Sequence, residues 1–499
     1  MDDRSSSRRP QRQGSAPRSQ RQQPPVRPQR GGRGMHMDMD VLNGRLAIFF
    51  VAFCVFALIL AIRLFGLMVI DAQANLNRDS SREVTVDVQP RRGTIYDRNG
   101  TILATTVDAY NVFCHPHMVS SDKVDQLAQA LADAFGGEVQ DYKNKITTDS
   151  NFAYLYKGAD EDGMKKIKDL GIEGVDFEKT TKRVYPCGAT ASQIIGILNS
   201  EGKAITGLEL YYDDILGGTA GHKTTEYSKE GVPVPGSEKV TAEVVNGQDI
   251  VLSIDVDMQQ KLEESLALRV EEVQGKGGSA ILMDSATYAC SSSPTFDITD
   301  LSEVKEGATN LSGISSAYEP GSIMKPLTML AALLDGKVTL DSTYYCPAAL
   351  KVDDYTITDS HERPSEDMSV STIIAESSNV GISLVAKDLT FTRLYEYIQQ
   401  FQLCDKTGVD YPGEASGTIA PKNEWSTVQG YNISFGQGLT TTPIEMVRFY
   451  GALANDGVAC TPHFLTDVPS ESERRSYETA QITDNAGAIS DLESMMQQT

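Results

Sequence analysis

A single uninterrupted run of 17 apolar residues most constrains how this chain can fold. It occupies residues 46–62, and a shorter apolar stretch continues after Arg63 as far as Ile70. Since a helix rises about 1.5 Å per residue, about 20 residues cross the hydrocarbon core of a bilayer. Arg63 can extend its aliphatic stem and hold its charge at the interface. The pattern predicts one transmembrane helix over residues 46–70.

Charge is distributed unevenly around this run. Residues 1–34 carry nine arginines against two aspartates, whereas residues 71–499 carry 34 basic and 64 acidic side chains. Because positive charge marks the cytoplasmic end of a membrane helix, residues 1–45 are expected to be a cytoplasmic tail and the acidic body to lie outside the cell. The Arg, Gln, Pro and Ser content predicts that the tail is disordered. The acidic body argues against nucleic-acid binding.

A cleaved signal peptide is the alternative interpretation of the apolar run. Ala72-Gln73-Ala74 has the small-residue spacing of a cleavage site. The run is nevertheless longer than a typical signal core, and the tail before it is long. Both lengths favour an anchor that is not cleaved.

The seven cysteines add little to this interpretation. Cys54 lies in the apolar run, and the other six belong to the outer body, where disulfides can persist. Their spacing does not determine a pairing. The segment Cys114-His115-Pro116-His117 resembles half of a metal site, but no second pair lies nearby. A coincidental loop is the favoured interpretation, and the sequence implies no metal.

Local patterns indicate mixed helix and strand in the outer body. Asn99-Gly100 lies between two β-prone runs, which is a strong hairpin signal. Helices are expected near residues 122–135 and over 257–272, the second beginning at an acidic cap. Residues 249–255 and 278–283 are expected to be strands.

The chemistry begins with a serine and a lysine. Ser322 and Lys325 have the S-x-x-K spacing, which also occurs at Ser120/Lys123, Ser200/Lys203 and Ser302/Lys305. Only Ser322 follows the turn Glu319-Pro320-Gly321 and precedes an apolar helix, with Pro326 tolerable in a first turn alone. A desolvated, neutral lysine one turn on could take the serine proton. The structural alternative is an N-cap serine followed by a surface lysine.

A second polar group lies at Ser377-Ser378-Asn379, between two helical runs. A hydroxyl and an amide two residues apart on a bend could move a proton and bind a substrate amide. Taken alone, a polar turn between helices would be the better interpretation.

Together these segments resemble the class B penicillin-binding proteins, which are membrane-anchored D,D-transpeptidases that cross-link peptidoglycan. The matching segments are RRGTIYDRNGTILA, RVYPCGATASQIIGILNSEGKAITGLELYYDDILGGTAG, YEPGSIMKPLTM, ESSNVGI and ISFGQGLTTTPIEMVRFYGALANDGV. The resemblance implies a multidomain α+β chain with a single transmembrane helix. It implies an extended, mostly-β pedestal domain of the dimerisation type over residues 71–245. A transpeptidase domain of the α/β serine β-lactamase-like type is implied over residues 246–499.

By this resemblance, Ser322 is the acylated nucleophile and Lys325 its general base. Ser377 relays a proton, and Asn379 holds the acyl-donor peptide. Peptidoglycan stem peptides would be the substrates, and β-lactams would acylate the same serine. No metal or organic cofactor is implied, and the expected partners are a membrane-embedded glycosyltransferase and other proteins of cell-wall synthesis or division.

Two other functions fit the same resemblance. In a D,D-carboxypeptidase, water instead of an amine would resolve the acyl-enzyme. A non-catalytic scaffold or β-lactam sensor would keep the fold and the partners alone. Acylation without cross-linking would indicate the sensor, and the pedestal resemblance favours transpeptidation.

The family's third motif, K-[ST]-G, is spelled by Lys406-Thr407-Gly408. We reject this match because it lies in a segment that resembles a family loop before GQG. The motif should come after the GALANDGV segment, and nothing after Val458 reads K-[ST]-G. We therefore expect the chain to end before that motif and to catalyse inefficiently.

Overall fold

The computed structural model describes residues 39–65, 83–226, 236–284, 286–472 and 474–498. The chain divides into two compact units, residues 1–83 and residues 84–499. In the first unit, the described element is helix α1 (Met39–Phe65).

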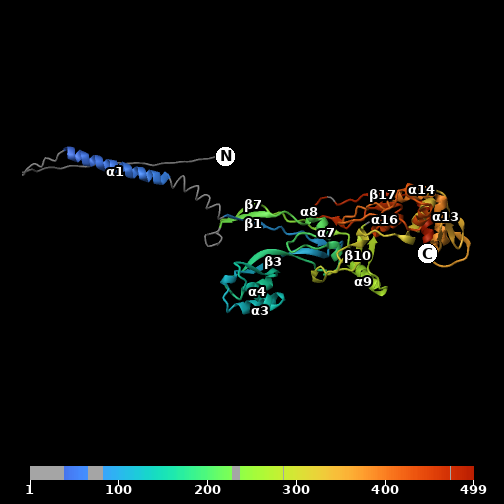
Figure 1. Cartoon of the computed structure of the whole chain (residues 1–499), viewed down its shortest axis with the longest axis horizontal. Helices are drawn as coiled ribbons and strands as arrows, with labels where there is room; N and C mark the ends of the chain where they lie inside the picture. The colour runs from blue at the N-terminus through green and yellow to red at the C-terminus, as the bar shows by residue number, and fades with distance from the viewer. Residues whose placement is uncertain (1–38, 66–82, 227–235, 285, 473, 499) are drawn as a thin grey trace, which may run out of the picture. The chain divides into compact units, whose positions relative to one another are not determined.

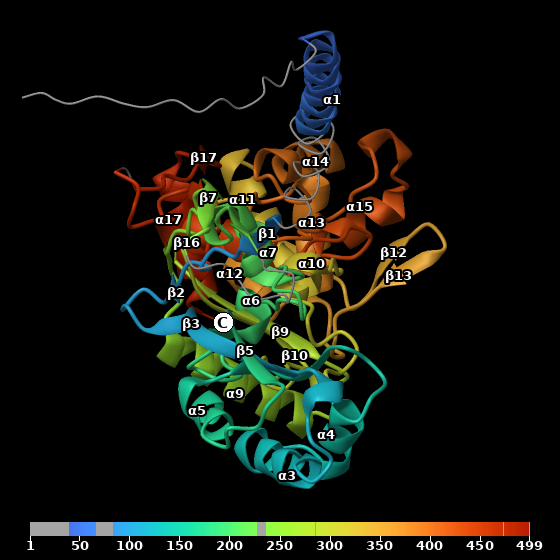
Figure 2. The same ribbon diagram turned by 90° about the vertical axis from the view of Figure 1, so that its left-hand side faces the viewer.

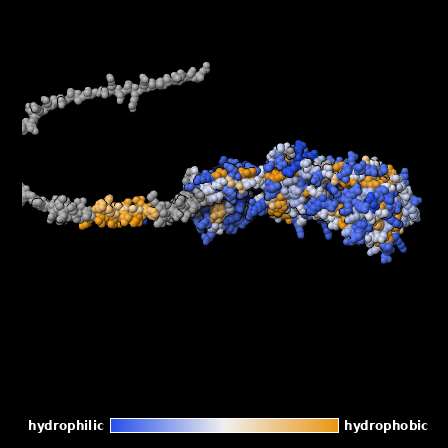
Figure 3. All heavy atoms as spheres, turned by 90° about the horizontal axis from the view of Figure 1, so that it is seen from above, coloured by the Kyte–Doolittle hydropathy of each residue, from blue (hydrophilic) through white to orange (hydrophobic). Residues whose placement is uncertain are grey.

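Over residues 48–65, helix α1 exposes apolar side chains on every side. The segment Ile48–Phe65 is long and apolar enough to cross a membrane, and its large side chains lie at the surface (Figure 3, orange). A helix that is apolar all round requires an apolar environment. α1 begins before the predicted residue 46, since no proline interrupts the backbone there. The predicted end at 66–70, the residues before Met39 and the possible cleavage site at 72–74 lie outside the described residues.

The amino-terminal half of the second unit combines strands with short helices. Its elements are β1 (Glu83–Val88), β2 (Ile95–Tyr96), β3 (Ile102–Cys114), η2 (Pro116–Met118), α3 (Val124–Phe135), α4 (Val139–Ile146), β4 (Ala153–Ala159), α5 (Glu161–Lys168), β5 (Val175–Val184), α6 (Ser192–Ile195), α7 (Gly207–Tyr211), α8 (Asp213–Leu216), β6 (Gly221–Glu226) and β7 (Lys239–Ala242). Strands β1, β6 and β7 form a small sheet of their own.

The long strand β3 organises this half. It pairs with β2, β4 and β5, in every case antiparallel. The turn from β2 to β3 is the predicted hairpin at Asn99-Gly100, and Gly100 has the positive φ of 86° that such a turn needs. Helices α3, α4 and α5 pack beside β3 and β4 around a separate apolar core (Figure 2), and α3 confirms the helix predicted near 122–135.

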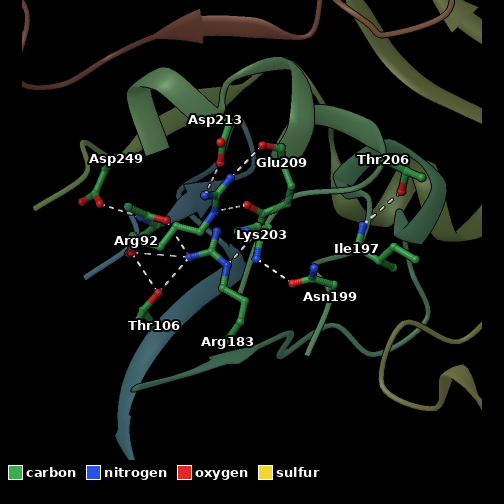
Figure 4. Close-up of polar contacts among 12 residues, drawn as sticks. Arg92, Thr106, Arg183, Ile197, Asn199, Lys203, Thr206, Glu209, Asp213 and Asp249 are labelled. Atoms are coloured by element: carbon green, nitrogen blue, oxygen red, sulfur yellow. Dashed lines mark hydrogen bonds and ion pairs between the residues drawn. The ribbon is translucent and has the colours of Figure 1, made fainter. Parts of the chain in front are cut away.

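A buried ion cluster joins three segments of this half (Figure 4). The carboxylate of Glu209 on α7 is fully buried and accepts from the guanidinium groups of Arg92 and Arg183. Arg183 also donates through Nη1 to the carbonyl of Gly93 at 2.6 Å. A Cβ at Gly93 would lie 1.9 Å from the carbonyl oxygen of Gln248, so this position accepts only glycine. The segment Arg91-Arg92-Gly93 therefore packs the start of β2 against α7.

The carboxyl-terminal half contains more helix than strand (Figure 1). Its elements are β8 (Ile250–Leu252), α9 (Val256–Glu272), β9 (Gly278–Met283), β10 (Thr287–Ser293), η3 (Leu301–Glu303), α10 (Ser312–Ser315), η4 (Gly321–Met324), α11 (Lys325–Leu334), β11 (Thr343–Cys346), β12 (Leu350–Val352), β13 (Tyr355–Ile357), β14 (Glu366–Ser369), α12 (Val370–Ala375), α13 (Asn379–Leu389), α14 (Phe391–Gln400), η5 (Lys422–Glu424), α15 (Thr427–Ser434), α16 (Pro443–Leu453), β15 (Val458–Cys460), β16 (Leu465–Asp467), β17 (Thr479–Gln481) and α17 (Ala486–Met496). The predictions of strands within 249–255 and 278–283 and of a helix over 257–272 are confirmed by β8, β9 and α9. Asp255 caps α9 through the backbone N–H of Met258.

One apolar core lies among the helices of the carboxyl-terminal half, and another contains residues of both halves. The first gathers side chains of α11, α12, α13, α14, α16 and α17. The second joins Ile95 and Leu103 of the amino-terminal half to Leu465 on β16. Strand β8 pairs with both β2 and β16, so the two halves share a sheet as well as a core.

The loop that spells K-T-G takes part in this joint. Thr407 donates its backbone N–H and its hydroxyl to Glu414, both at 2.6 Å. Further along the loop, the buried carboxylate of Asp410 accepts from Tyr212 Oη at 2.6 Å, and Tyr411 Oη donates to the carbonyl of Gln193 at 2.7 Å. The loop therefore docks the two halves to each other.

The cysteines are unpaired. All seven lie in the described part of the chain, and Cys114, Cys290 and Cys346 are buried. The pairing that the sequence left open is absent from this structure.

Candidate active site

Ser322 lies in the short helical turn η4, which runs directly into α11. Pro326 is in the first turn of α11, where a missing N–H leaves no helical carbonyl without its partner. The tight turn is possible because Gly321 has a positive φ of 59°. The structure therefore places Ser322 in a short helical turn and Lys325 at the first position of the helix that follows.

The Lys325 side chain is buried and points at three oxygen atoms. Only 2% of the surface of Lys325 is exposed to solvent. Its Nζ donates to Ser322 Oγ at 3.1 Å, to Ser377 Oγ at 2.9 Å and to the carbonyl of Ser377 at 2.5 Å. Burial lowers the pKa of Lys325 to about 8, and the nearby carboxylate of Asp359 opposes that decrease. A lysine with such a pKa is partly neutral at physiological pH and can accept a proton.

Ser377 owes its place to the way α12 ends. Its φ is 55°, in the left-handed region. The backbone N–H of Ser377 donates to the carbonyl of Ile374, and the backbone N–H of Ser378 donates to the carbonyl of Ile373. These are the two hydrogen bonds of a Schellman motif, in which glycine is the usual residue at the left-handed position. The motif turns the chain so that both the hydroxyl and the carbonyl of Ser377 face Lys325.

The next two residues begin α13. Ser378 caps the helix by accepting from the N–H of Gly381 at 2.9 Å, and Asn379 is its first residue. The side-chain amide of Asn379 donates to the carbonyl of Thr358 at 3.0 Å. The structure thus brings Ser322, Lys325 and Ser377 into direct contact. Asn379 lies next to this group, and within the described residues its recorded hydrogen bond goes elsewhere.

A glycine-rich loop supports the turn that carries Ser322. The N–H of Gly321 donates to the carbonyl of Gly436 at 2.9 Å, and the N–H of Gly438 donates to Glu319 Oε1 at 2.8 Å. A Cβ at Gly436 would lie 2.1 Å from the carbonyl oxygen of Gly321. From α16, Tyr450 Oη donates to the carbonyl of Ile323 at 2.8 Å. Contact with the turn that carries Ser322 therefore fixes the shape of the segment Gly436-Gln437-Gly438.

Strand β9 and helix α16 form the walls of a groove that reaches Ile323, the residue after Ser322. Within the described residues, β9 pairs with β10 alone. The groove holds about 530 Å³. Its apolar lining includes Ile281, Met283, Ile323, Met446, Val447 and Tyr450.

Lys406-Thr407-Gly408 lies outside every strand of the described chain, in the docking loop. None of its recorded hydrogen bonds reaches Ser322 or Lys325; Thr407 and Gly408 bond to Glu414 instead. This geometry agrees with the rejection of these residues as the third motif.

Two charged residues of the site could not be recognised from the sequence. Asp359 accepts from Ser378 Oγ at 2.9 Å and from Arg363 Nε at 2.6 Å, and both charged side chains are nearly buried. Their spacing of four residues is a weak signal, because it falls in an irregular segment and not on a helix. Among the described residues, no group of three or more His, Cys, Asp or Glu side chains gathers in a way that could hold a metal ion.

Comparison with known proteins assigns both halves to domain families. Residues 278–499 match the penicillin-binding protein transpeptidase domain, and residues 87–252 match the penicillin-binding protein dimerisation domain. A crystal structure of penicillin-binding protein 2X from Streptococcus thermophilus aligns with a TM-score of 0.68 at 27% identity, covering 83% of this chain and 66% of that one. A crystal structure from Atopobium parvulum, described as a candidate peptidoglycan glycosyltransferase, aligns with a TM-score of 0.62 at 32% identity, covering 83% and 78%.

Curated relatives agree with the structures. Penicillin-binding protein PbpB of Mycolicibacterium smegmatis is 29% identical over 85% of this chain and 69% of its own length. Peptidoglycan D,D-transpeptidase FtsI of Escherichia coli is 27% identical over 79% of this chain and 68% of its own length. The fold and the two domain matches define a penicillin-binding protein. The chain belongs to class B of that family, in which a dimerisation domain precedes the transpeptidase domain.

Proposed function

We propose that this protein is a D,D-transpeptidase that cross-links peptidoglycan stem peptides through an acyl-enzyme on Ser322. The observation that carries the proposal is the buried Lys325, whose Nζ lies between the hydroxyls of Ser322 and Ser377. With a pKa of about 8, roughly a tenth of Lys325 is neutral at pH 7. That fraction is the general base.

In the first half-reaction, Ser322 Oγ bonds to the carbonyl carbon of the penultimate D-alanine as its proton passes to Lys325. The C–N bond to the terminal D-alanine then breaks. The leaving amine takes a proton that Ser377 relays from Lys325, and free D-alanine departs. Asn379 holds the donor peptide through its side-chain amide.

In the second half-reaction, an amine of a neighbouring stem peptide attacks the ester carbonyl. Its proton returns through Lys325 to Ser322 Oγ as the new amide forms. Penicillin enters at the first step and leaves Ser322 blocked, since its ring-opened acyl group stays attached. No step needs a metal or an organic cofactor.

Labelled penicillin tests this proposal directly. We expect covalent labelling of the native protein, mapped by peptide mass spectrometry to Ser322, and no labelling of Ser322→Ala. Ser302→Ala, which changes a serine of the same spacing elsewhere, is the matched control and should label normally. Label that persists in Ser322→Ala would show that another residue is the nucleophile.

Cross-linking distinguishes transpeptidation from hydrolysis. Incubated with a donor stem peptide and an acceptor amine, the enzyme should yield a new amide besides free D-alanine. Release of D-alanine with no amide product would favour a D,D-carboxypeptidase. Acylation with neither product would favour a β-lactam sensor.

We further propose that α1 anchors the protein in the plasma membrane, with residues 1–45 in the cytoplasm and the body outside. The apolar surface of α1 and the nine arginines before it support this topology. Protease added to intact spheroplasts should remove the body and spare an amino-terminal tag. A mature chain that begins at Asn75 would instead mean that the segment is a cleaved signal peptide.

The domain limits and protein partners belong to the same proposal. We place the pedestal over residues 71–245 and the transpeptidase domain over 246–499. The dimerisation-domain match, residues 87–252, extends seven residues past this boundary, and the transpeptidase match, residues 278–499, begins after it. The partners would be a membrane-embedded glycosyltransferase and other proteins of cell-wall synthesis or division. Crosslinking in cells from sites on the pedestal, followed by mass spectrometry, would identify them; recovery of cytoplasmic proteins alone would contradict the proposed side of the membrane.

A further inference from the structure

A buried carboxylate, that of Asp359, contacts the turn formed by Ser377-Ser378-Asn379. Asp359 is on the segment between β13 and β14, and its side chain is 7% exposed. Its Oδ1 accepts from the N–H of Val380 at 2.9 Å, and its Oδ2 accepts from Ser378 Oγ at 2.9 Å. The preceding carbonyl, that of Thr358, accepts from the side chain of Asn379. Two neighbouring residues thus bind the whole start of α13.

Arg363 holds this carboxylate from the other side. Its Nε donates to Asp359 Oδ2 at 2.6 Å, and its side chain is 10% exposed. Its remaining donors reach backbone carbonyls, including Cys346 at 3.0 Å and Pro347 at 3.3 Å. Because the guanidinium is planar and has several fixed contacts, it leaves Asp359 little freedom to rotate.

The position of Ser377 depends on the residues that come after it in the chain. Ser377 has a left-handed backbone, and it faces Lys325 with both its carbonyl and its hydroxyl. The bonds of Ser378 and Val380 to Asp359 hold the chain immediately after this turn. A turn in an uncommon conformation persists when its surroundings over-determine it.

We propose that Asp359 is a positioning residue for acyl transfer: it holds the 377–379 turn against Lys325 and supports the charged form of that lysine. Asp359 touches no reacting atom, and it acts through Ser378 and through its charge. This inference rests on the proposed function, since it assigns a second task to the surroundings of the proposed base.

The effect of the Asp359 charge can be separated from its effect on the position of the turn, because the direction of the pKa shift is known for both Asp359 and Lys325. Burial pushes the pKa of Asp359 up, but hydrogen bonds from Val380, Arg363 and Ser378 outweigh it, and the pKa lies below its usual value. Asp359 is therefore ionised at neutral pH. Of the groups that face Lys325, Ser322 and Ser377 are uncharged, and Asp359 raises the pKa of Lys325 against the effect of burial. Arg363 contacts Asp359, and none of its recorded hydrogen bonds within the described residues reaches Lys325.

Asp359→Asn should change both properties. The amide keeps an oxygen for Ser378 and Val380, but it carries no charge and presents donors to Arg363. Without the carboxylate, the ammonium of Lys325 loses support, so its pKa should fall by about one unit. The acid limb of the pH–rate profile for penicillin acylation should move to lower pH by the same amount. The plateau rate should fall roughly tenfold, because a charged hydrogen-bond partner of the turn is lost.

Two variants make this result specific. Asp359→Glu keeps the charge and displaces the oxygens, so its limb should stay at the parent pH while its rate falls. Asp335→Asn removes another carboxylate that is paired with an arginine, Arg393, at the far end of α11. Asp335→Asn should leave the acid limb unchanged. A purely structural role for Asp359 would lower the rate of both Asp359 variants and move neither limb.

A measurement without penicillin separates this inference from the proposed function. Trace acetylation of Lys325 by acetic anhydride across pH, read by mass spectrometry, reports its pKa directly. If the parent does not react with penicillin, the proposed function fails, and the acetylation curve still decides the inference. An unchanged Lys325 pKa in Asp359→Asn would overturn the inference. If the Asn variant does not fold, Asp359→Glu with the parent rate would overturn it instead.

Discussion

The turn that carries Ser322 and Lys325 and the turn that carries Ser120 and Lys123 share one spacing and differ in everything around it. Ser120 donates to Asp122, and the Lys123 ammonium reaches Gln126 Oε1 at 3.1 Å, both in exposed positions. Lys325 is buried, and its recorded bonds go to two serines. Both turns lead into a helix, so the local fold does not distinguish them.

The difference teaches that burial, and not the S-x-x-K spacing, lowers the pKa of such a lysine. An exposed ammonium is solvated by water and keeps its proton. A buried ammonium loses that solvation, so its neutral form becomes accessible near physiological pH. Lys325 is the first residue of α11, whose other residues are mostly buried, and its Nζ donates to Ser377 at the α12–α13 turn.

The largest expected effect tests the lysines of the two turns against each other. Lys325→Ala should slow penicillin acylation by about 10²–10⁴, the usual contribution of a general base. Lys123→Ala should leave the rate within about twofold of the parent, because an exposed ammonium far from the site takes no part in proton transfer. Time courses with labelled penicillin measure both. Equal rates for Lys325→Ala and the parent would mean that burial has no catalytic consequence here.

The pH dependence sharpens the same contrast. If neutral Lys325 is the base, as proposed, its pKa of about 8 means that acylation should slow by about tenfold for each pH unit below that value and level off above it. Acylation rates taken at half-unit steps from about pH 5.5 to pH 9.5 would measure this. A rate that is flat between pH 6 and pH 8 would contradict the assignment of Lys325 as base.

Ser377→Ala should have a smaller effect than loss of the lysine. The substitution removes one acceptor of Lys325 and the proposed proton relay, but the backbone carbonyl of residue 377 still accepts from Lys325. A fall of roughly tenfold is expected, comparable to one hydrogen bond. Ser120→Ala, which removes a hydroxyl three residues before Lys123, is the control. A Ser377→Ala rate as low as that of Lys325→Ala would make the hydroxyl, not the carbonyl, the main partner.

The smallest expected effect concerns the K-T-G spelling. Lys406→Ala should change acylation by less than about twofold, since Lys406 belongs to the docking loop and not to the site. A large loss of acylation, with an unchanged melting temperature, would return Lys406-Thr407-Gly408 to consideration as a working motif.

The features that could be predicted from the sequence are those that depend on local residue patterns. The apolar run predicted α1, Asn99-Gly100 predicted the β2–β3 hairpin, and a proline after Ser322 predicted the first turn of a helix. Each depends on residues within one turn or one hairpin. The contact of Ser322, Lys325 and Ser377 was expected from family resemblance and not from spacing, because it joins α11 to the end of α12.

The features that sequence could not predict arise from tertiary contacts. Asp359 and Arg363 lie in a segment without periodicity, so nothing local indicates that they are buried beside α13. The docking role of Asp410 and Tyr411 depends on Tyr212 and Gln193, which lie far earlier in the chain. Helix α1 begins at Met39, before the predicted span, because apolar content marks the membrane-spanning part of a helix and not the end of its hydrogen bonding.

The left-handed backbone of Ser377 sets two selective pressures against each other. Glycine would adopt this conformation without the steric cost that a side chain carries, about 1 kcal/mol, but it would remove the hydroxyl that meets Lys325. Selection for heat resistance alone would therefore favour Ser377→Gly, and selection for a growing cell wall would reject it. Residue 377 is thus a diagnostic position: a natural variant with glycine there would keep the left-handed turn and lose the hydroxyl contact with Lys325.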